Sequence, residues 1–192
     1  METESPKSIF RFRGGHPALD LTATLTGRLK AVQRELLVTP ADLAQWLAQA
    51  GLAEAGAVVS QRDLAVAHSL REAIYMLASA AIAGKALPDA SVDMLNAIAA
   101  CPQAVPEIGY DGRIRLVGNA GALLARLAGD AALLLGGPER ARLRQCDGAS
   151  CAILFVDRSR RGDRRWCSMR GCGNKAKVDA FRGKKKADAP TG

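Results

Sequence analysis

The chain has 192 residues and a net charge of +8, with 48% hydrophobic, 24% charged and 4% aromatic residues. This length suits one domain, or one domain with a small appendage, and the hydrophobic content excludes a disordered chain. No apolar run approaches the roughly 18 residues of a membrane span, and the polar residues 1–8 contain no signal-peptide core, so we expect a cytoplasmic protein with no membrane partner.

The positive charge is concentrated in the last quarter of the chain. Residues 140–192 contain 15 Lys and Arg against 5 Asp and Glu, a net +10, whereas residues 1–139 contain 12 against 14, a net −2. A terminal module of one charge sign predicts a polyanionic partner. For residues 183–192 alone, a solvated basic tail is the simpler interpretation.

Cap residues and apolar spacing predict the helices of the first hundred residues. Thr39 is a suitable N-cap, with Pro40 at the first helical position and Asp42 in the first turn, where the helix dipole favours it. Ser60 begins the longest periodic stretch, and Gly84 ends it. We expect a short helix after the loop at residues 10–17, and further helices over residues 40–50, 60–83 and 88–100.

After residue 100 the apolar residues change from helical to strand-like spacing. Residues 107–110 and 113–117 flank Asp111-Gly112, a two-residue signal for a β-hairpin. Asn119 can cap another helix, which Gly136 and Gly137 close, and residues 139–145 are expected to add a short helical turn.

These elements predict a mainly α protein. We expect a helical N-terminal domain with one β-hairpin over residues 1–139, and a separate C-terminal module over residues 140–192. Because the linker between them is short, we expect the module to pack on the helical domain.

Four of the five cysteines lie in the C-terminal module, as Cys146-x4-Cys151 and Cys167-x4-Cys172 separated by fifteen residues. Two such pairs around a hairpin-sized insert predict a closed tetrathiolate zinc site. An iron–sulfur cluster and two disulfides are the alternatives, and disulfides are rare in a cytosolic chain. Cys101 has no partner in this pattern, and we interpret it as a small buried apolar residue.

The insert between the cysteine pairs has an internal pattern. Residues 152–156 form a strand-like apolar run, residues 158–165 form an arginine-rich turn, and residues 166–167 begin the return strand. From Cys172 the sequence becomes helical until Gly183. The order of knuckle, hairpin and helix predicts a treble-clef-like zinc finger, which needs its metal to fold. Replacing one ligand cysteine is expected to unfold this module and leave the helical domain intact.

The module resembles the CGNR zinc finger. The resemblance is carried by the cysteine pairs, by Leu154-Phe155-x-Asp157-x-Ser159-Arg160, and by Arg164-Arg165-Trp166-Cys167-Ser168-Met169-x-x-Cys172-Gly173-Asn174-Lys175. Upstream, Gly14-Gly15, Leu19-Asp20 and Leu43-x-x-Trp46-Leu47 resemble the ABATE domain that commonly precedes this finger.

This resemblance implies a bacterial stress-induced transcription regulator with a DNA-binding finger and a helical domain that senses a ligand. It assigns zinc to Cys146, Cys151, Cys167 and Cys172. The chain departs from the family pattern at Lys175, where the family has Arg, and at Ala23, where the family tends to have Asn.

The first functional hypothesis is therefore a zinc-containing, DNA-binding transcription regulator. The arginine-rich turn could follow phosphates, and the helix after Cys172 could face a groove. The residues expected to contact nucleic acid are Arg158, Arg160, Arg161, Arg164, Arg165, Asn174, Lys175, Lys177 and Arg182. Alternatively, Arg164, Arg165 and Arg170 offset the charge of the zinc thiolates.

Three other hypotheses compete with DNA binding. The basic patch could bind RNA, or zinc could only hold the shape of a protein-interaction module. An enzyme is not expected, because the only two histidines, His16 and His68, fit local structural roles and a four-cysteine site has no open metal position. A small-molecule ligand of the helical domain and a homodimer are further expectations.

Overall fold

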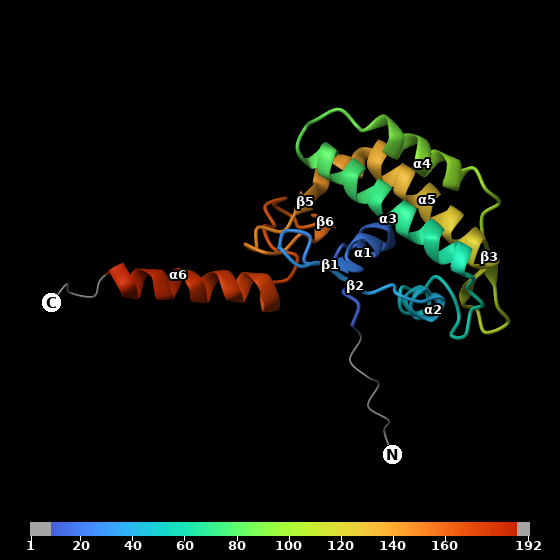
Figure 1. The fold of residues 1–192 in the computed structure, drawn as a ribbon, viewed down its shortest axis with the longest axis horizontal. Coiled ribbons are helices and arrows are strands. Elements are labelled where there is room, and N and C mark those ends of the chain that lie inside the picture. The colour runs from blue at the N-terminus through green and yellow to red at the C-terminus, as the bar shows by residue number, and fades with distance from the viewer. Residues whose placement is uncertain (1–8, 188–192) are drawn as a thin grey trace, which may run out of the picture.

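The computed structural model describes residues 9–187 and confirms the mainly α fold (Figure 1). Its helices are α1 (Pro17–Thr22), α2 (Pro40–Gln49), α3 (Gln61–Ile82), α4 (Asp89–Ala99), α5 (Ala120–Gly136) and α6 (Asn174–Ala187). Its strands are β1 (Leu25–Thr26), β2 (Arg34–Glu35), β3 (Val105–Ile108), β4 (Ile114–Val117), β5 (Leu143–Gln145) and β6 (Leu154–Val156). No helix among the described residues is both long enough and apolar enough to cross a membrane.

The predicted caps begin the predicted helices. Thr39 and Asp42 form a reciprocal capping box at α2, and Ser60 and Asp63 form another at α3. Asn119 accepts a hydrogen bond from the backbone N–H of Ala122 at the start of α5. Each cap satisfies backbone donors that the first helical turn leaves free.

The core surrounds α3, which contacts α1, α2, α4, α5 and the β5–β6 pair. It consists mainly of Leu and Ala side chains, as the low aromatic content requires, with Trp46 as its largest fully buried member. Leu143, Leu154 and Val156 of the C-terminal module belong to the same core. The two parts of the chain therefore share this hydrophobic interior, and a second, smaller cluster forms around Cys146, Phe155 and Cys167. The division at residues 139–140 stays a prediction.

The predicted β-hairpin is present as β3–β4, but its turn is longer than expected. The N–H of Gly109 bonds to the carbonyl of Arg113, and the N–H of Gly112 bonds to the carbonyl of Gly109. Three residues therefore connect the last bonded pair, with Gly112 in the left-handed conformation at φ 74°.

A second strand pair, β1–β2, was not expected in the helical domain. A buried charge cluster attaches it to α3: Arg71 bonds to Glu35 of β2 at 2.6 Å and to the Thr24 hydroxyl at 3.2 Å. Arg28, in the loop that follows β1, makes a bidentate pair with Glu72 at 2.7 and 2.8 Å. These partners lie 36 to 47 residues apart, so local sequence patterns do not reveal them.

The C-terminal module differs from the prediction in its strand pairing. The run at residues 152–156 does not pair with residues 166–167; β6 instead pairs antiparallel with β5, which precedes the first cysteine. This pairing buries Leu143, Leu154 and Val156 against the helices, whereas the return segment contains no strand. The helical turn expected at residues 139–145 is a 3₁₀ turn, Pro138–Arg142, followed by β5.

The predicted helix after Cys172 is present as α6 and runs past Gly183 to Ala187. Figure 1 shows that α6 extends away from the rest of the molecule. The remainder of the predicted basic tail, and the polar residues 1–8, lie outside the described residues.

Candidate metal centre

The four cysteines of the C-terminal module come together at the end of the β5–β6 pair. Cys146 follows β5, and its N–H bonds to the Ile153 carbonyl at 3.0 Å. Cys151 closes a tight turn through a 2.8 Å bond to the Gly148 carbonyl. Cys172 lies in the π-helical turn Met169–Gly173 that precedes α6. All four Sγ atoms lie within 4.8 Å of one another.

The spacing of the sulfur atoms fits one tetrahedral metal ion. The Sγ of Cys167 lies 3.8 Å from the Sγ atoms of both Cys151 and Cys172. Zinc–thiolate bonds of about 2.3 Å place tetrahedral ligands about 3.8 Å apart. All four cysteines are free, so the alternative of two disulfides does not apply in this structure. The donor set and its geometry are those of a structural zinc site.

Backbone groups support the sulfur atoms. The N–H of Cys167 donates to the Sγ of Cys146 at 3.3 Å. A side chain at Gly148 would be crowded, since a Cβ there would lie 3.1 Å from the Cβ of Cys151 and 3.3 Å from the Sγ of Cys172. A glycine at this position therefore allows the turn that contains Cys151 and the turn that contains Cys172 to lie close together.

The thiols also change one another's pKa. A hydrogen bond from the Cys167 thiol lowers the pKa of Cys151 to about 5. The same hydrogen bond, together with burial, raises the pKa of Cys167. Because zinc binds thiolates rather than thiols, metal binding releases protons from this cluster.

The N-terminal loop of the helical domain contacts β6 directly. The N–H of Val156 donates to the Gly14 carbonyl at 2.9 Å, and the guanidinium of Arg158 donates to the Gly15 carbonyl at 2.7 Å. Arg158 also makes a bidentate pair with Glu139 at 2.7 and 2.9 Å. Asp20 holds this loop in place by accepting the Gly14 N–H at 2.7 Å, and burial raises the pKa of Asp20 to about 6.

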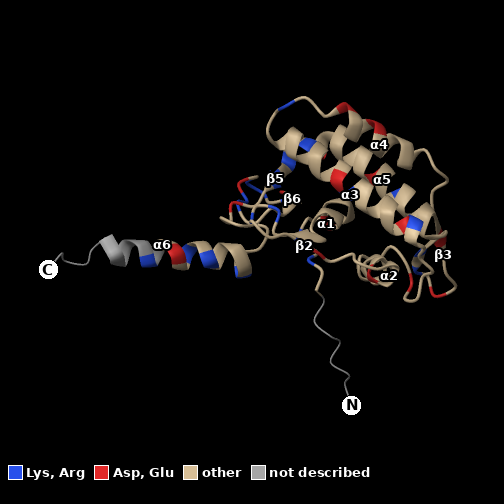
Figure 2. Ribbon diagram, viewed as in Figure 1, with Lys and Arg blue, Asp and Glu red and all other residues tan. Residues whose placement is uncertain are grey.

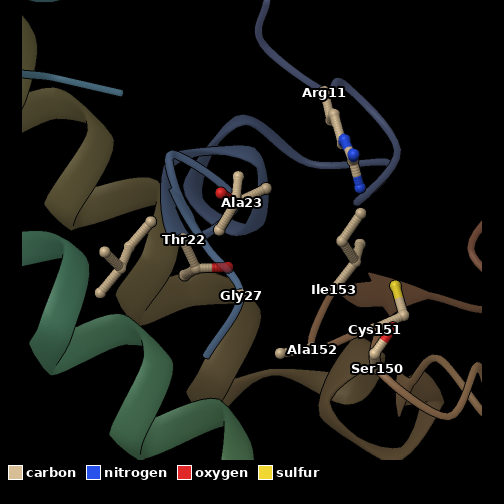
Figure 3. Close-up of a pocket in the computed structure, with 10 residues that line it drawn as sticks. Arg11, Thr22, Ala23, Gly27, Ser150, Cys151, Ala152 and Ile153 are labelled. Carbon is tan, nitrogen blue, oxygen red and sulfur yellow. The ribbon is translucent and has the colours of Figure 1, made fainter. Parts of the chain in front are cut away.

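A small cavity lies where this loop and the β1–β2 segment meet the cysteines (Figure 3). Its volume is about 40 Å³, and its lining includes Arg11, Thr22, Ala23 and Cys151. Figure 3 shows the guanidinium of Arg11 directed toward Ile153. Such a volume suits a water molecule rather than a metabolite. Ala23, the position at which the family tends to have Asn, therefore borders a water-sized space beside the metal ligands.

Three of the nine residues predicted to contact nucleic acid form hydrogen bonds or ion pairs with other groups of the protein. Arg158 pairs with Glu139 and Gly15, as described above. Arg164 stacks on Phe155 at 4.4 Å and donates to the carbonyls of Trp166 and Cys167 at 2.9 and 2.6 Å. Arg165 bonds to Asp147 at 2.7 Å. Arg158 and Arg165 are exposed despite these contacts, and the other exposed residues of the predicted set are Arg160, Arg161, Asn174, Lys175, Lys177 and Arg182.

Asp157 belongs to the family motif, but its role in the site was not predicted. It is fully buried, and its carboxylate accepts the backbone N–H groups of Ser159 and Arg164, both at 2.9 Å. It therefore fixes both ends of the arginine-rich turn. An Asp two residues before a Ser is a signal for such a turn, and it could have indicated this role.

The two histidines have structural roles. The Nδ1 of His16 accepts the Ala18 N–H as the cap of α1, and the Nε2 of His68 lies 2.9 Å from the Leu37 carbonyl. The backbone N–H of Asp20 donates to the His16 carbonyl at 3.0 Å, whereas the Asp20 carboxylate accepts the Gly14 N–H.

Two family models match the chain in the order expected from the resemblance. Residues 15–138 match ABATE, described as "Putative stress-induced transcription regulator", and residues 142–185 match the CGNR zinc finger. No curated protein matches the chain.

Proposed function

We propose that this chain, which belongs to the ABATE family of stress-induced transcription regulators and contains a CGNR zinc finger, regulates transcription by binding double-stranded DNA through that finger. Zinc holds the finger together through Cys146, Cys151, Cys167 and Cys172. Both families are of regulator and zinc-finger types rather than enzymes.

Helix α6 is the observation that carries this proposal. Residues 174–187 contain six Lys and Arg against one Asp, and basic residues gather along the helix and on the neighbouring loops (Figure 2). Within the described part of the chain, its main contact is with the π-helical turn that precedes it. An isolated 14-residue helix is marginal in water, so a binding partner along its exposed length would stabilise α6.

The dimensions and chemistry of α6 suit the major groove of DNA. An α-helix with its side chains is about 10–12 Å wide, and the major groove is about 12 Å wide. Lys175, Lys177 and Arg182 supply phosphate contacts, and Asn174 at the start of the helix is able to read a base edge. Ligand sensing by the helical domain and a homodimer stay predictions.

A salt series tests the proposal. Binding of the zinc-loaded chain to a mixed-sequence duplex is measured by fluorescence anisotropy, with Cys167→Ser as the disrupted finger and Cys101→Ser as the matched control. If Arg160, Arg161, Lys175, Lys177 and Arg182 each neutralise one phosphate, the log–log salt slope is about −4.5. Absence of binding at low salt, or equal binding by Cys167→Ser, refutes the proposal and favours a protein-interaction module.

A further inference from the structure

The arginine-rich turn ends in a small, fixed tip. The two N–H groups bound by Asp157 belong to Ser159 and Arg164, so one buried carboxylate closes the turn, and only residues 160–163 lie beyond it. Within the tip, the N–H of Gly162 bonds to the carbonyl of Ser159 at 3.3 Å and to its hydroxyl at 3.2 Å. Gly162 adopts the left-handed conformation at φ 66°.

Two arginines occupy the outermost positions of this tip. Arg160 and Arg161 are the central residues of the β-turn, and both are exposed. The other arginines of the turn are bound to groups of the protein: Arg158 to Gly15 and Glu139, Arg164 to the Trp166 and Cys167 carbonyls, and Arg165 to Asp147. The turn therefore presents two adjacent guanidinium groups on a narrow, preorganised support, with Asp163 as the only acidic residue of the tip.

We infer that Arg160 and Arg161 insert into the minor groove of A·T-rich DNA, an inference that rests on the proposed DNA-binding function. The minor groove is about 6 Å wide, so it excludes a helix such as α6 but admits single side chains. A·T tracts narrow this groove further and strengthen its negative potential, which attracts arginine. Arginine suits such a site because a guanidinium is more weakly hydrated than an ammonium.

The buried clamp explains how a two-residue tip contributes to affinity. Flexible arms lose conformational entropy when they enter a groove, and this loss weakens binding. Asp157 and Gly162 hold the backbone of the tip before DNA arrives, so only the two side chains become ordered. Together with α6 in the adjacent major groove, the tip would read base composition at a position that the helix does not contact.

Three duplexes separate minor-groove reading from other contacts. They have equal length and identical ends, and their central turn of helix contains A·T, G·C or inosine·C pairs. Inosine lacks the 2-amino group of guanine, so an inosine·C pair has the major-groove groups of G·C and the minor-groove groups of A·T. The zinc-loaded full chain is expected to bind the A·T and inosine·C duplexes equally, and the G·C duplex about tenfold more weakly.

Variants assign this preference to the tip. Arg160→Ala with Arg161→Ala is expected to abolish the tenfold preference, and Arg160→Lys with Arg161→Lys to reduce it while retaining most of the overall affinity. Lys177→Ala, the matched control on α6, is expected to weaken binding to all three duplexes equally. Zinc content and circular dichroism verify that each variant is folded.

Two results overturn the inference while leaving DNA binding intact. Equal binding of the three duplexes by the unmodified chain assigns the tip to phosphates, and a preference that persists in the double alanine variant assigns it to another element. Absence of binding to all three duplexes refutes the proposed function itself, so the two failures are distinguishable.

Discussion

Removing zinc tests how far the metal stabilises the C-terminal module. We expect metal loss, by chelation or in Cys167→Ser, to release the segment from Cys146 to Ile153 and the turn that contains Cys172, while strands β5 and β6 stay docked on the helices. This expectation is narrower than the one drawn from the sequence, which was that the whole module unfolds.

The burial of three side chains gives the stability with which β5 and β6 stay docked when the metal is lost. Leu143, Leu154 and Val156 are at most 2% exposed and belong to the core of the helical domain. Burial of such a side chain stabilises a fold by about 1.5–3 kcal/mol, so the three together contribute about 5–9 kcal/mol without any metal. The second cluster, which contains Phe155, Ile153 and the metal ligands, is small and depends on zinc.

Hydrogen exchange followed by mass spectrometry measures the two regions separately. Peptides that cover residues 146–151 and 168–173 are expected to lose protection on chelation, whereas the peptide that covers β6 keeps it. Cys101→Ser serves as the control for a cysteine change, because Cys101 lies outside the metal site and is exposed; the expectation that it is buried was wrong. Loss of protection in β6 at the same rate as in the cysteine turns would refute the reasoning.

Three further predictions concern single residues. Arg158→Ala should leave the salt slope of DNA binding unchanged, because its guanidinium is bound to Gly15 and Glu139. Lys177→Ala should reduce the magnitude of the slope by about 0.9, and equal slopes for the two variants in anisotropy would contradict this. The pKa of Asp20 is raised to about 6, so between about pH 4 and 6 the folded chain retains a proton that the unfolded chain releases. The free energy of unfolding therefore falls by up to about 3 kcal/mol as the pH rises through this window. Asp20→Asn should remove that loss, and its advantage in urea unfolding should grow from pH 4 to 7; a constant difference would count against it. Gly148→Ala should weaken zinc binding about tenfold in a chelator competition, because its Cβ crowds Cys172, while Gly136→Ala, which has open space, should not.

Local signals predicted the helices and the metal ligands well. Thr39, Ser60 and Asn119 each act through groups three residues away, so their caps are visible in the sequence. The cysteine quartet was visible because spacing alone restricts the ligands of a small zinc site.

Partners distant in sequence could not be predicted. The pairing of β6 with β5 rather than with residues 166–167 depends on which apolar residues the helical core accepts. The roles of the arginines could not be predicted either, because only the contact with Gly15 distinguishes Arg158 from Arg160 and Arg161. Composition thus indicated a basic module, but only the fold distinguished its free arginines from its structural ones.

The contact between the N-terminal loop and β6 also constrains the order of folding. Arg158 and Gly15 are 143 residues apart, so on the ribosome the loop near Gly14 and helix α1 await a partner that is synthesised much later. Contacts of such long sequence separation form late and slow folding. The helices α3, α4 and α5, which follow one another in the chain, can assemble first. Docking of β6 against the Gly14 loop then completes the native structure, so a nascent chain that stops before residue 154 leaves its first helix without its final support.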